Sequence, residues 1–164
     1  MSSTYATGPQ TVEKGIRDAL ADGSNGVAAQ LATLAGLGEP TVTDPNEYVR
    51  KKNNDTAPNA PSCSVYLSAN DPIDRFTAHR YDVMTFVAEV VAGAEGEEQA
   101  RINAQVYAQA MDMVVSKFLH TEQVDGVGLV DLTDSDVRPA DGGDLNRWVG
   151  FIEFDCHVRT LRHQ

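Results

Sequence analysis

The segment from Tyr81 to Val91 is the feature that most constrains how this chain can fold. It is rich in β-branched and aromatic residues and contains neither Gly nor Pro. Read with a period of two, it has apolar side chains on both faces. One face carries Met84, Phe86, Ala88 and Val90, and the other carries Tyr81, Val83, Thr85, Val87 and Glu89. A strand that is apolar on both faces belongs inside a sheet covered on both sides, so we expect a central strand.

Three further segments have strand character. Cys63, Val65 and Leu67 alternate with polar residues, and the sequence Asn-Asp-Pro at 70–72 predicts a turn after them. Residues 127–132 predict a short strand. The segment 147–159 predicts a half-buried antiparallel strand. Its core face carries Trp148, Gly150, Ile152, Phe154, Cys156 and Val158, and its wet face carries Glu153, Asp155, His157 and Arg159. Cys156 is then a buried thiol, and His157 is expected to pair across strands.

Helical spacing is clearest in residues 95–119. Its apolar stripe comprises Val106, Tyr107, Ala110, Met111, Val114 and Phe118, and its polar face comprises Gln105, Gln109, Asp112 and Ser116. A first helix is expected from Thr11, as N-cap, to Leu20. A second helix would use Val27, Leu31 and Leu34 as its stripe, with Ser24 or Asn25 as its cap and Gly36 and Gly38 at its end. A single kinked helix is the alternative.

These elements predict an α+β fold. We expect an antiparallel sheet of four or five strands, one long amphipathic helix, and an N-terminal helix packed on it. Residues 1–10 are expected to be a flexible N-terminal arm, and residues 11–164 a single domain. The segment 38–62 contains four prolines and no convincing element, so a long loop is expected there. It is either a disordered surface loop or an arm that orders on a partner.

The composition is strongly acidic. Asp and Glu total 24 against 13 Lys and Arg, which gives a net charge of −11 and repels nucleic acid. Asp exceeds Glu and Arg exceeds Lys, which is typical of proteins from extreme halophiles and also of GC-rich genomes. No apolar run approaches the roughly 18 residues of a membrane span, and the N-terminus lacks the order of a signal peptide. We therefore expect no membrane association.

Motifs that would carry chemistry are absent. The sequence has no GxxxxGK[ST], GxGxxG, GxSxG or HExxH pattern, and its two cysteines form no CxxC. A calcium loop that began at Asp134 would meet Arg138 and Pro139 where a ligand and the turn glycine belong, and Leu145 in place of the bidentate acid. We therefore expect no enzyme, cofactor or metal site, and we interpret residues 134–146 as a solvated acidic loop.

The order of the elements is helix or two helices, long loop, strand, long strand, amphipathic helix, short strand, loop and long strand. This order resembles the tail terminator proteins of tailed viruses, which are also called tail completion or head–tail joining proteins. The resemblance covers roughly residues 11–160. It depends on the opening helix at 12–20, the strand at 81–91, the helix at 95–119 and the closing strand at 147–159. The break at 23–26 and the loop at 38–62 depart from the family pattern.

The resemblance implies a structural protein of the virion tail or neck, assembled in the host cytoplasm. Members of the family form rings, usually of six copies, that cap the tail tube, end its polymerisation and offer a surface to the neck. The implied partners are other copies of the chain, the tail tube protein and a neck or head completion protein. DNA passes through the lumen without specific binding. The alternatives are another neck or minor tail protein, or a small ligand-binding domain or enzyme with an unrecognised pocket.

Candidate contacts to subunits or partners lie in the two long polar loops, 38–62 and 133–146. In the first loop they are Arg50, Lys51 and Lys52, because basic groups are scarce and a neighbouring subunit is equally acidic. In the second loop they are Asp134, Asp136 and Arg138. A solvated charged loop is the alternative interpretation of both sets.

Salt dependence distinguishes the two explanations of the acid excess. If it is an adaptation to salt, repulsion among the negative groups destabilises the fold at low ionic strength. The Debye length is about 30 Å at 0.01 M and about 3 Å at 1 M, so screening then rises steeply. We expect the melting temperature, followed by circular dichroism, to rise by many degrees between these two conditions. If the melting temperature does not change with salt concentration, a GC-rich genome explains the excess of acidic residues.

Overall fold

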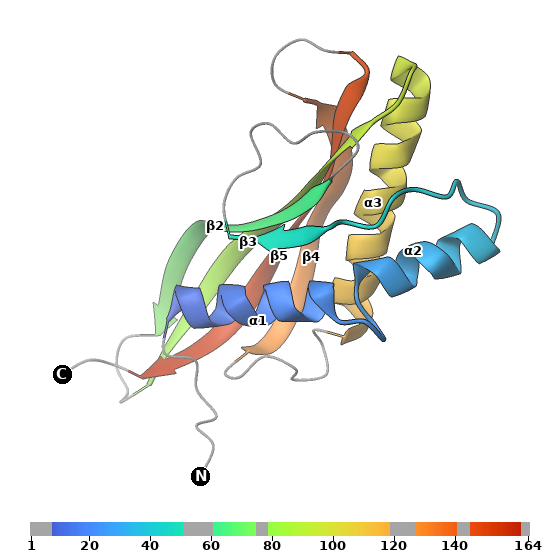
Figure 1. The fold of residues 1–164 in the computed structure, drawn as a ribbon. Helices are drawn as coiled ribbons and strands as arrows, with labels where there is room; N and C mark the ends of the chain where they lie inside the picture. The colour runs from blue at the N-terminus through green and yellow to red at the C-terminus, as the bar shows by residue number, and fades with distance from the viewer. Residues whose placement is uncertain (1–7, 51–60, 75–78, 119–126, 141–144, 162–164) are drawn as a thin grey trace.

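The computed structural model describes residues 8–50, 61–74, 79–118, 127–140 and 145–161, and all statements below concern these residues. They form three helices and one five-stranded sheet (Figure 1). The helices are α1 (Pro9–Ala21), α2 (Val27–Gly36) and α3 (Glu97–Phe118). The strands are β1 (Glu47–Val49), β2 (Ser62–Asp74), β3 (His79–Gly93), β4 (Val127–Pro139) and β5 (Arg147–Leu161). The α+β prediction is confirmed.

The sheet has the order β1-β2-β3-β5-β4, so β3 and β5 are its central strands. β1 runs parallel to β2, and the other neighbours are antiparallel. α3 packs along β3, β4 and β5, while α1 packs against β2 and α2 packs against α3 (Figure 1). The prediction that residues 81–91 form a central strand is therefore confirmed, as are the long helix and the N-terminal helix that packs with it.

The core lies between the sheet and the helices. Phe86 on β3 and Phe154 on β5 are fully buried directly opposite each other, with ring centroids 6.2 Å apart. Met111 on α3 and Ile16 on α1 are also fully buried. The two thiols, Cys63 and Cys156, lie in this core, and burial raises the pKa of each to about 12. The expectation of a buried Cys156 is confirmed.

Gly150 sets how closely α3 approaches the sheet. A Cβ atom at this position would lie 2.0 Å from the carbonyl oxygen of Ala104 and 3.2 Å from the backbone nitrogen of Ala108. Both neighbours are backbone atoms, so no side-chain rotation can relieve the overlap. Only glycine lets α3 lie directly on β5 at this point.

The two strands that flank the central pair, β2 and β4, are longer than the sequence predicted. β2 runs through residues 70–72 to Asp74, so the predicted turn is wrong. Beyond Ser64 no described strand pairs with the outer side of β2, and an edge strand tolerates a proline such as Pro72. β4 runs to Pro139 instead of ending near residue 132, because its pairing with β5 continues to Pro139 opposite Trp148. The predicted acidic loop at 133–146 is therefore strand up to Pro139.

The predicted loop at 38–62 contains the short strand β1, which pairs with residues 62–64 of β2. The backbone nitrogen of Asn46 donates to the carbonyl oxygen of Pro61, and the Tyr107 hydroxyl of α3 donates to the carbonyl oxygen of Thr43. These two bonds hold the segment before β1 against the body of the protein. β1 was not predicted, because three residues are too few to show a period.

The predicted helix starts need correction. α1 begins at Pro9, not at Thr11, with Gly8 as its N-cap, since proline suits the first turn of a helix. α2 is a separate helix, so the kinked-helix alternative is wrong. Its N-cap is Gly26, not Ser24 or Asn25, because a Cβ atom there would lie 2.4 Å from the carbonyl oxygens of Leu20 and Asp22.

Two other expectations are partly met. Trp148 lies on the core side of β5 but is half-buried, and its indole nitrogen donates to the carbonyl oxygen of Leu145. Residues 1–7 of the expected N-terminal arm lie outside the described residues, and the helix already includes residues 9 and 10.

The contact at Gly150 yields a stability prediction. We expect Gly150→Ala to cost about 3 kcal/mol, because the new methyl group overlaps the α3 backbone. Gly36→Ala is the matched control: nothing lies within 4 Å of its added Cβ, and alanine favours a helix, so it should be neutral or stabilising by about 0.5 kcal/mol. Urea unfolding of both variants measures the difference. Equal stabilities would show that α3 does not rest on Gly150.

Candidate interaction surfaces

The structure separates the charged residues that the sequence singled out into two groups. Arg50 directly follows β1, and Lys51 and Lys52 follow it outside the described residues. Asp134, Asp136 and Arg138 lie on β4. β1 and β4 are the opposite edges of the sheet, so these residues do not form one site. They mark two surfaces, one at each edge.

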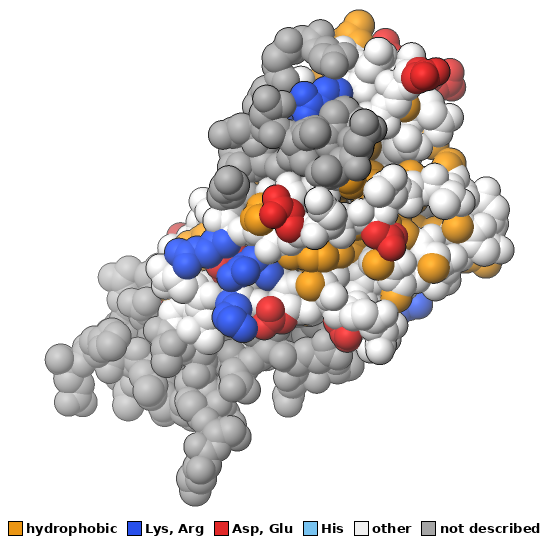
Figure 2. Space-filling model, viewed as in Figure 1, with side chains coloured by type: hydrophobic (Ala, Val, Ile, Leu, Met, Phe, Trp, Pro, Cys, Tyr) orange, Lys and Arg blue, Asp and Glu red, His pale blue; other side chains and the backbone are white. Residues whose placement is uncertain are grey.

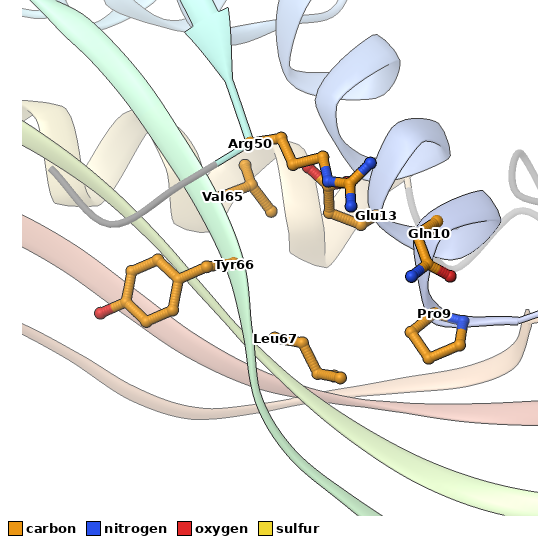
Figure 3. A pocket seen from close by; sticks show the side chains of 7 residues that line it. All are labelled: Pro9, Gln10, Glu13, Arg50, Val65, Tyr66 and Leu67. Atoms are coloured by element: carbon orange, nitrogen blue, oxygen red, sulfur yellow. The ribbon is translucent and has the colours of Figure 1, made fainter.

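The first surface is a groove between α1 and β2, with a volume of about 190 Å³ (Figure 3). Its lining residues are Pro9, Gln10, Glu13, Arg50, Val65, Tyr66 and Leu67. In Figure 3, Arg50 and Glu13 face each other beneath α1, while the Tyr66 ring points away from the helix. Pro9, Val65 and Leu67 make the groove partly apolar, and Arg50 supplies a cation at its side. We call this surface the Arg50 groove.

One buried carboxylate organises the charges of the Arg50 groove. Glu13 is only 4% exposed. Its Oε1 atom accepts from Arg17 Nε at 2.7 Å, and its Oε2 atom lies 3.4 Å from Arg50 Nε. A buried carboxylate requires such partners, because leaving water without them costs several kcal/mol. Two arginines thus share one negative charge, which leaves the trio with a net positive charge.

Basic side chains gather on this face of an otherwise acidic protein. Figure 2 shows Lys and Arg side chains clustered over one half of α1. This cluster comprises Lys14 and Arg17 of α1, and Arg50, which follows β1. The Arg50 side chain is 58% exposed and the Lys14 side chain 67% exposed, so both can reach a partner.

The second surface is the outer edge of β4, which we call the aspartate edge. Asp131, Asp134 and Asp136 are all exposed along it. Asp134 lies opposite Glu153 of β5, and Asp131 lies opposite Asp155, so acidic groups meet across the two strands. His157 Nε2 lies 3.4 Å from Asp131 Oδ2, which confirms the predicted cross-strand pairing of His157. This edge is the acidic counterpart of the Arg50 groove.

Arg138, the third candidate on β4, makes an internal ion pair. Its Nη2 atom lies 3.0 Å from Oε2 of Glu89, which is 1% exposed in the central strand β3. The Tyr66 hydroxyl also bonds this carboxylate; burial first, and then the charge of Glu89, raise the pKa of Tyr66. Sequence reasoning missed this site. The sequence did carry a signal, since Glu89 and Asp82 are the two carboxylates in a segment predicted to be covered on both faces.

The thiols and His157 of the described residues have structural surroundings, and these residues hold no metal arrangement. The two thiols are in the core, and His157 is paired with Asp131. No three His, Cys, Asp or Glu side chains in the described ranges stand close enough together to hold a metal ion. None of the described helices is long and apolar enough to cross a membrane.

Comparisons with known proteins give a weak likeness, and it is to solved structures. No protein-family model matches the sequence, and no curated protein does. Among solved structures, the chain is similar to a chain of a structure titled "Virion of native gene transfer agent (GTA) particle". The identity is 17%, the match covers 81% of this chain and 91% of that chain, and the TM-score is 0.38. A TM-score of this size does not establish a common fold.

The Glu89–Arg138 pair yields a second stability prediction. Arg138→Met removes the guanidinium and leaves the buried carboxylate without this partner, so we expect a loss of about 2 kcal/mol. This loss of stability is smaller than the loss expected for a fully buried ion pair, because the Arg138 side chain is 34% exposed. Adding Glu89→Gln to Arg138→Met should recover part of the loss.

Lys14→Met is the matched control, since it breaks the pair with Asp18, in which both side chains are more than 60% exposed. We expect a change below about 0.5 kcal/mol for it. Urea unfolding again measures the free energies. If Arg138→Met were as harmless as Lys14→Met, the pair with Glu89 would contribute nothing to the fold.

Proposed function

We propose that this chain is a structural protein of a tailed-virus particle. In this proposal, copies of the chain form a ring that caps the tail tube and ends its growth. Six subunits is the number that the family resemblance implies. The ring then joins the tail to the neck or head. The partners are further copies of the chain, the tail tube protein and a neck or head completion protein. The chain acts through shape and surface, without a cofactor.

The observation that carries the proposal is a sheet with two open and different edges. Among the described residues, β4 pairs only with β5, and the outer side of β2 has no strand partner beyond Ser64. An open edge presents backbone N–H and C=O groups that another chain can pair with. Because the two edges differ, one copy can use its first edge on the second edge of the next copy. Such head-to-tail contacts close into rings or extend into filaments.

Two further features support a ring through which DNA passes. The order of helices and strands in the structure is the order on which the resemblance to tail terminator proteins depends, with β1 added. The net charge of −11 suits a lumen in which DNA must slide without sticking, because like charges repel. The proposed contacts to neighbours are Arg50, Lys51, Lys52, Asp134, Asp136 and Arg138.

The Arg50 groove gives little support to the alternative of a small ligand-binding domain. Pockets for small ligands commonly have volumes of about 300–1,000 Å³ and bury most of the ligand. The Arg50 groove has about 190 Å³ and is open to solvent along α1. A groove of this size suits a side chain of a partner protein better than a separate ligand.

Mass photometry and negative-stain electron microscopy of the purified chain test the ring. We expect a closed particle of about six times the 17.7 kDa chain, with a central opening. Adding the particle to polymerising tail tube protein should shorten the tubes and decorate one of their ends. Bovine serum albumin at equal mass is the control for non-specific effects.

Two results would contradict the proposal in different ways. A chain that stays monomeric or dimeric up to about 100 µM, far above the Kd of a stable assembly, would exclude the ring. A ring that leaves tube length unchanged and labels no tube end would exclude the capping role, and would favour a neck protein instead.

A further inference from the structure

We infer that each contact in the ring is made by the aspartate edge of one copy against the Arg50 groove of the next, with Leu132 of the first copy packed on Leu67 of the second. The inference rests on the proposed ring and adds to it the two surfaces that meet. The partner is a second copy of this chain. Three independent features of the sheet support it.

The first feature is an apolar row that crosses four strands. Leu67 of β2 lies opposite Phe86, Phe86 lies opposite Phe154, and Phe154 lies opposite Leu132 of β4. Residues that are opposite each other in neighbouring strands share a face, so the four side chains form one row. The two phenylalanines are fully buried, whereas each leucine at the ends is 37% exposed. At each end of the row, a leucine side chain therefore leaves part of its apolar surface exposed to solvent.

The second feature is the backbone at the two leucines. The register of β2 on β3 shifts between Leu67 and Ala69, and the register of β4 on β5 shifts between Leu132 and Asp134. A bulge bends an edge strand and redirects the side chains beside it. Both edges thus have the same irregularity at the same row of the sheet. We infer that the two bulges prepare matching ends for a contact.

The third feature is the charge around each leucine. Leu132 stands between Asp131 and Asp134 in the chain and shares the core face with Phe154. Asp131, Asp134 and Asp136 lie on the other face of the same edge strand, opposite Asp155, Glu153 and Phe151. Leu67 lines the groove that contains Arg50, with Lys14 and Arg17 on the adjoining helix. Opposite potentials on two surfaces guide association and fix the orientation of the partners. Two copies of net charge −11 repel each other overall, but these two surfaces carry opposite charges and attract each other locally.

Arg50 can serve both its own chain and a neighbour. Its contact to Glu13 involves Nε, at 3.4 Å, and its side chain is 58% exposed. A guanidinium has five N–H donors, so further donors can meet an aspartate of the next copy. The contact is head-to-tail, because the two ends of the row lie at opposite edges of the sheet. Each copy therefore keeps a second edge for the next neighbour.

The apolar part is tested by Leu132→Ser, with Leu145→Ser as the matched control. Leu145 is 56% exposed and lies outside the row. The assay is mass photometry across a dilution series, and the readout is the chain concentration at which half of the chains are in rings. We expect Leu132→Ser to raise this concentration at least about tenfold, since an apolar side chain at an interface core becomes polar. Leu145→Ser should leave it unchanged.

The charged part is tested by a swap. Asp134→Lys/Asp136→Lys reverses one surface, and Lys14→Glu/Arg50→Glu reverses the other. Each variant alone should raise the half-assembly concentration at least about tenfold, and the variant with all four substitutions should return it to within about threefold of the original. Glu39→Lys and Lys117→Glu are exposed controls that make the same kinds of charge change away from both edges.

Melting temperatures show whether each variant folds, which matters for Arg50→Glu because it places a second carboxylate beside Glu13. If that variant fails to fold, Lys14→Glu alone replaces it in the swap. Rescue by the combined variant supports the inference. Rings that tolerate Leu132→Ser and both reversals, or reversals that never rescue each other, would overturn it while leaving the proposed function intact. If the unaltered chain forms no ring, the proposed function itself fails.

Discussion

The pairing of β3 with β5 is the constraint on which the rest of the structure depends. It runs from His79 opposite Leu161 to Gly93 opposite Arg147 without a register shift. This unbroken ladder places Phe86 on Phe154 in the core and sets Val90 beside Gly150, where α3 rests. Both flanking strands, in contrast, carry two register shifts each. The centre of the sheet is thus regular, and the irregularities lie in the strands at its sides.

The central elements could be predicted from the sequence because each shows its own period. Residues 81–91 and 147–159 alternate, and residues 95–119 have a helical stripe, so β3, β5 and α3 were found within a few residues. The ends of β2 and β4 depend instead on the strands beside them. Asn70 to Pro72 have the composition of a turn, yet they continue the ladder because β3 extends opposite them. Pairing with β3 in the tertiary structure therefore outweighed the local turn propensity of these residues.

The candidate surfaces could be predicted only in part. The scarcity of basic residues pointed to Arg50, and the length of the acidic segment pointed to Asp134 and Asp136. Their separation onto opposite edges followed from the strand order, which no local pattern encodes. Arg138 was predicted as a surface contact, but it reaches across β5 to the buried Glu89. The row that ends in Leu67 and Leu132 requires the register of three strand pairs, and a single residue of slip would remove it.

The aspartates of β4 also disfavour some contacts between the open edge of β4 and another copy of the chain. Two copies could in principle join β4 to β4, as exposed edge strands tend to do. That symmetric contact would bring Asp131, Asp134 and Asp136 of one copy against the same three residues of the other, and like charges across a contact are repulsive. In the inferred contact, the same edge meets Arg50 of the groove and Lys14 and Arg17 of the adjoining helix, and opposite charges replace this repulsion. The charge pattern therefore disfavours an isologous dimer, which ends growth at two copies, and favours the heterologous contact that a ring requires.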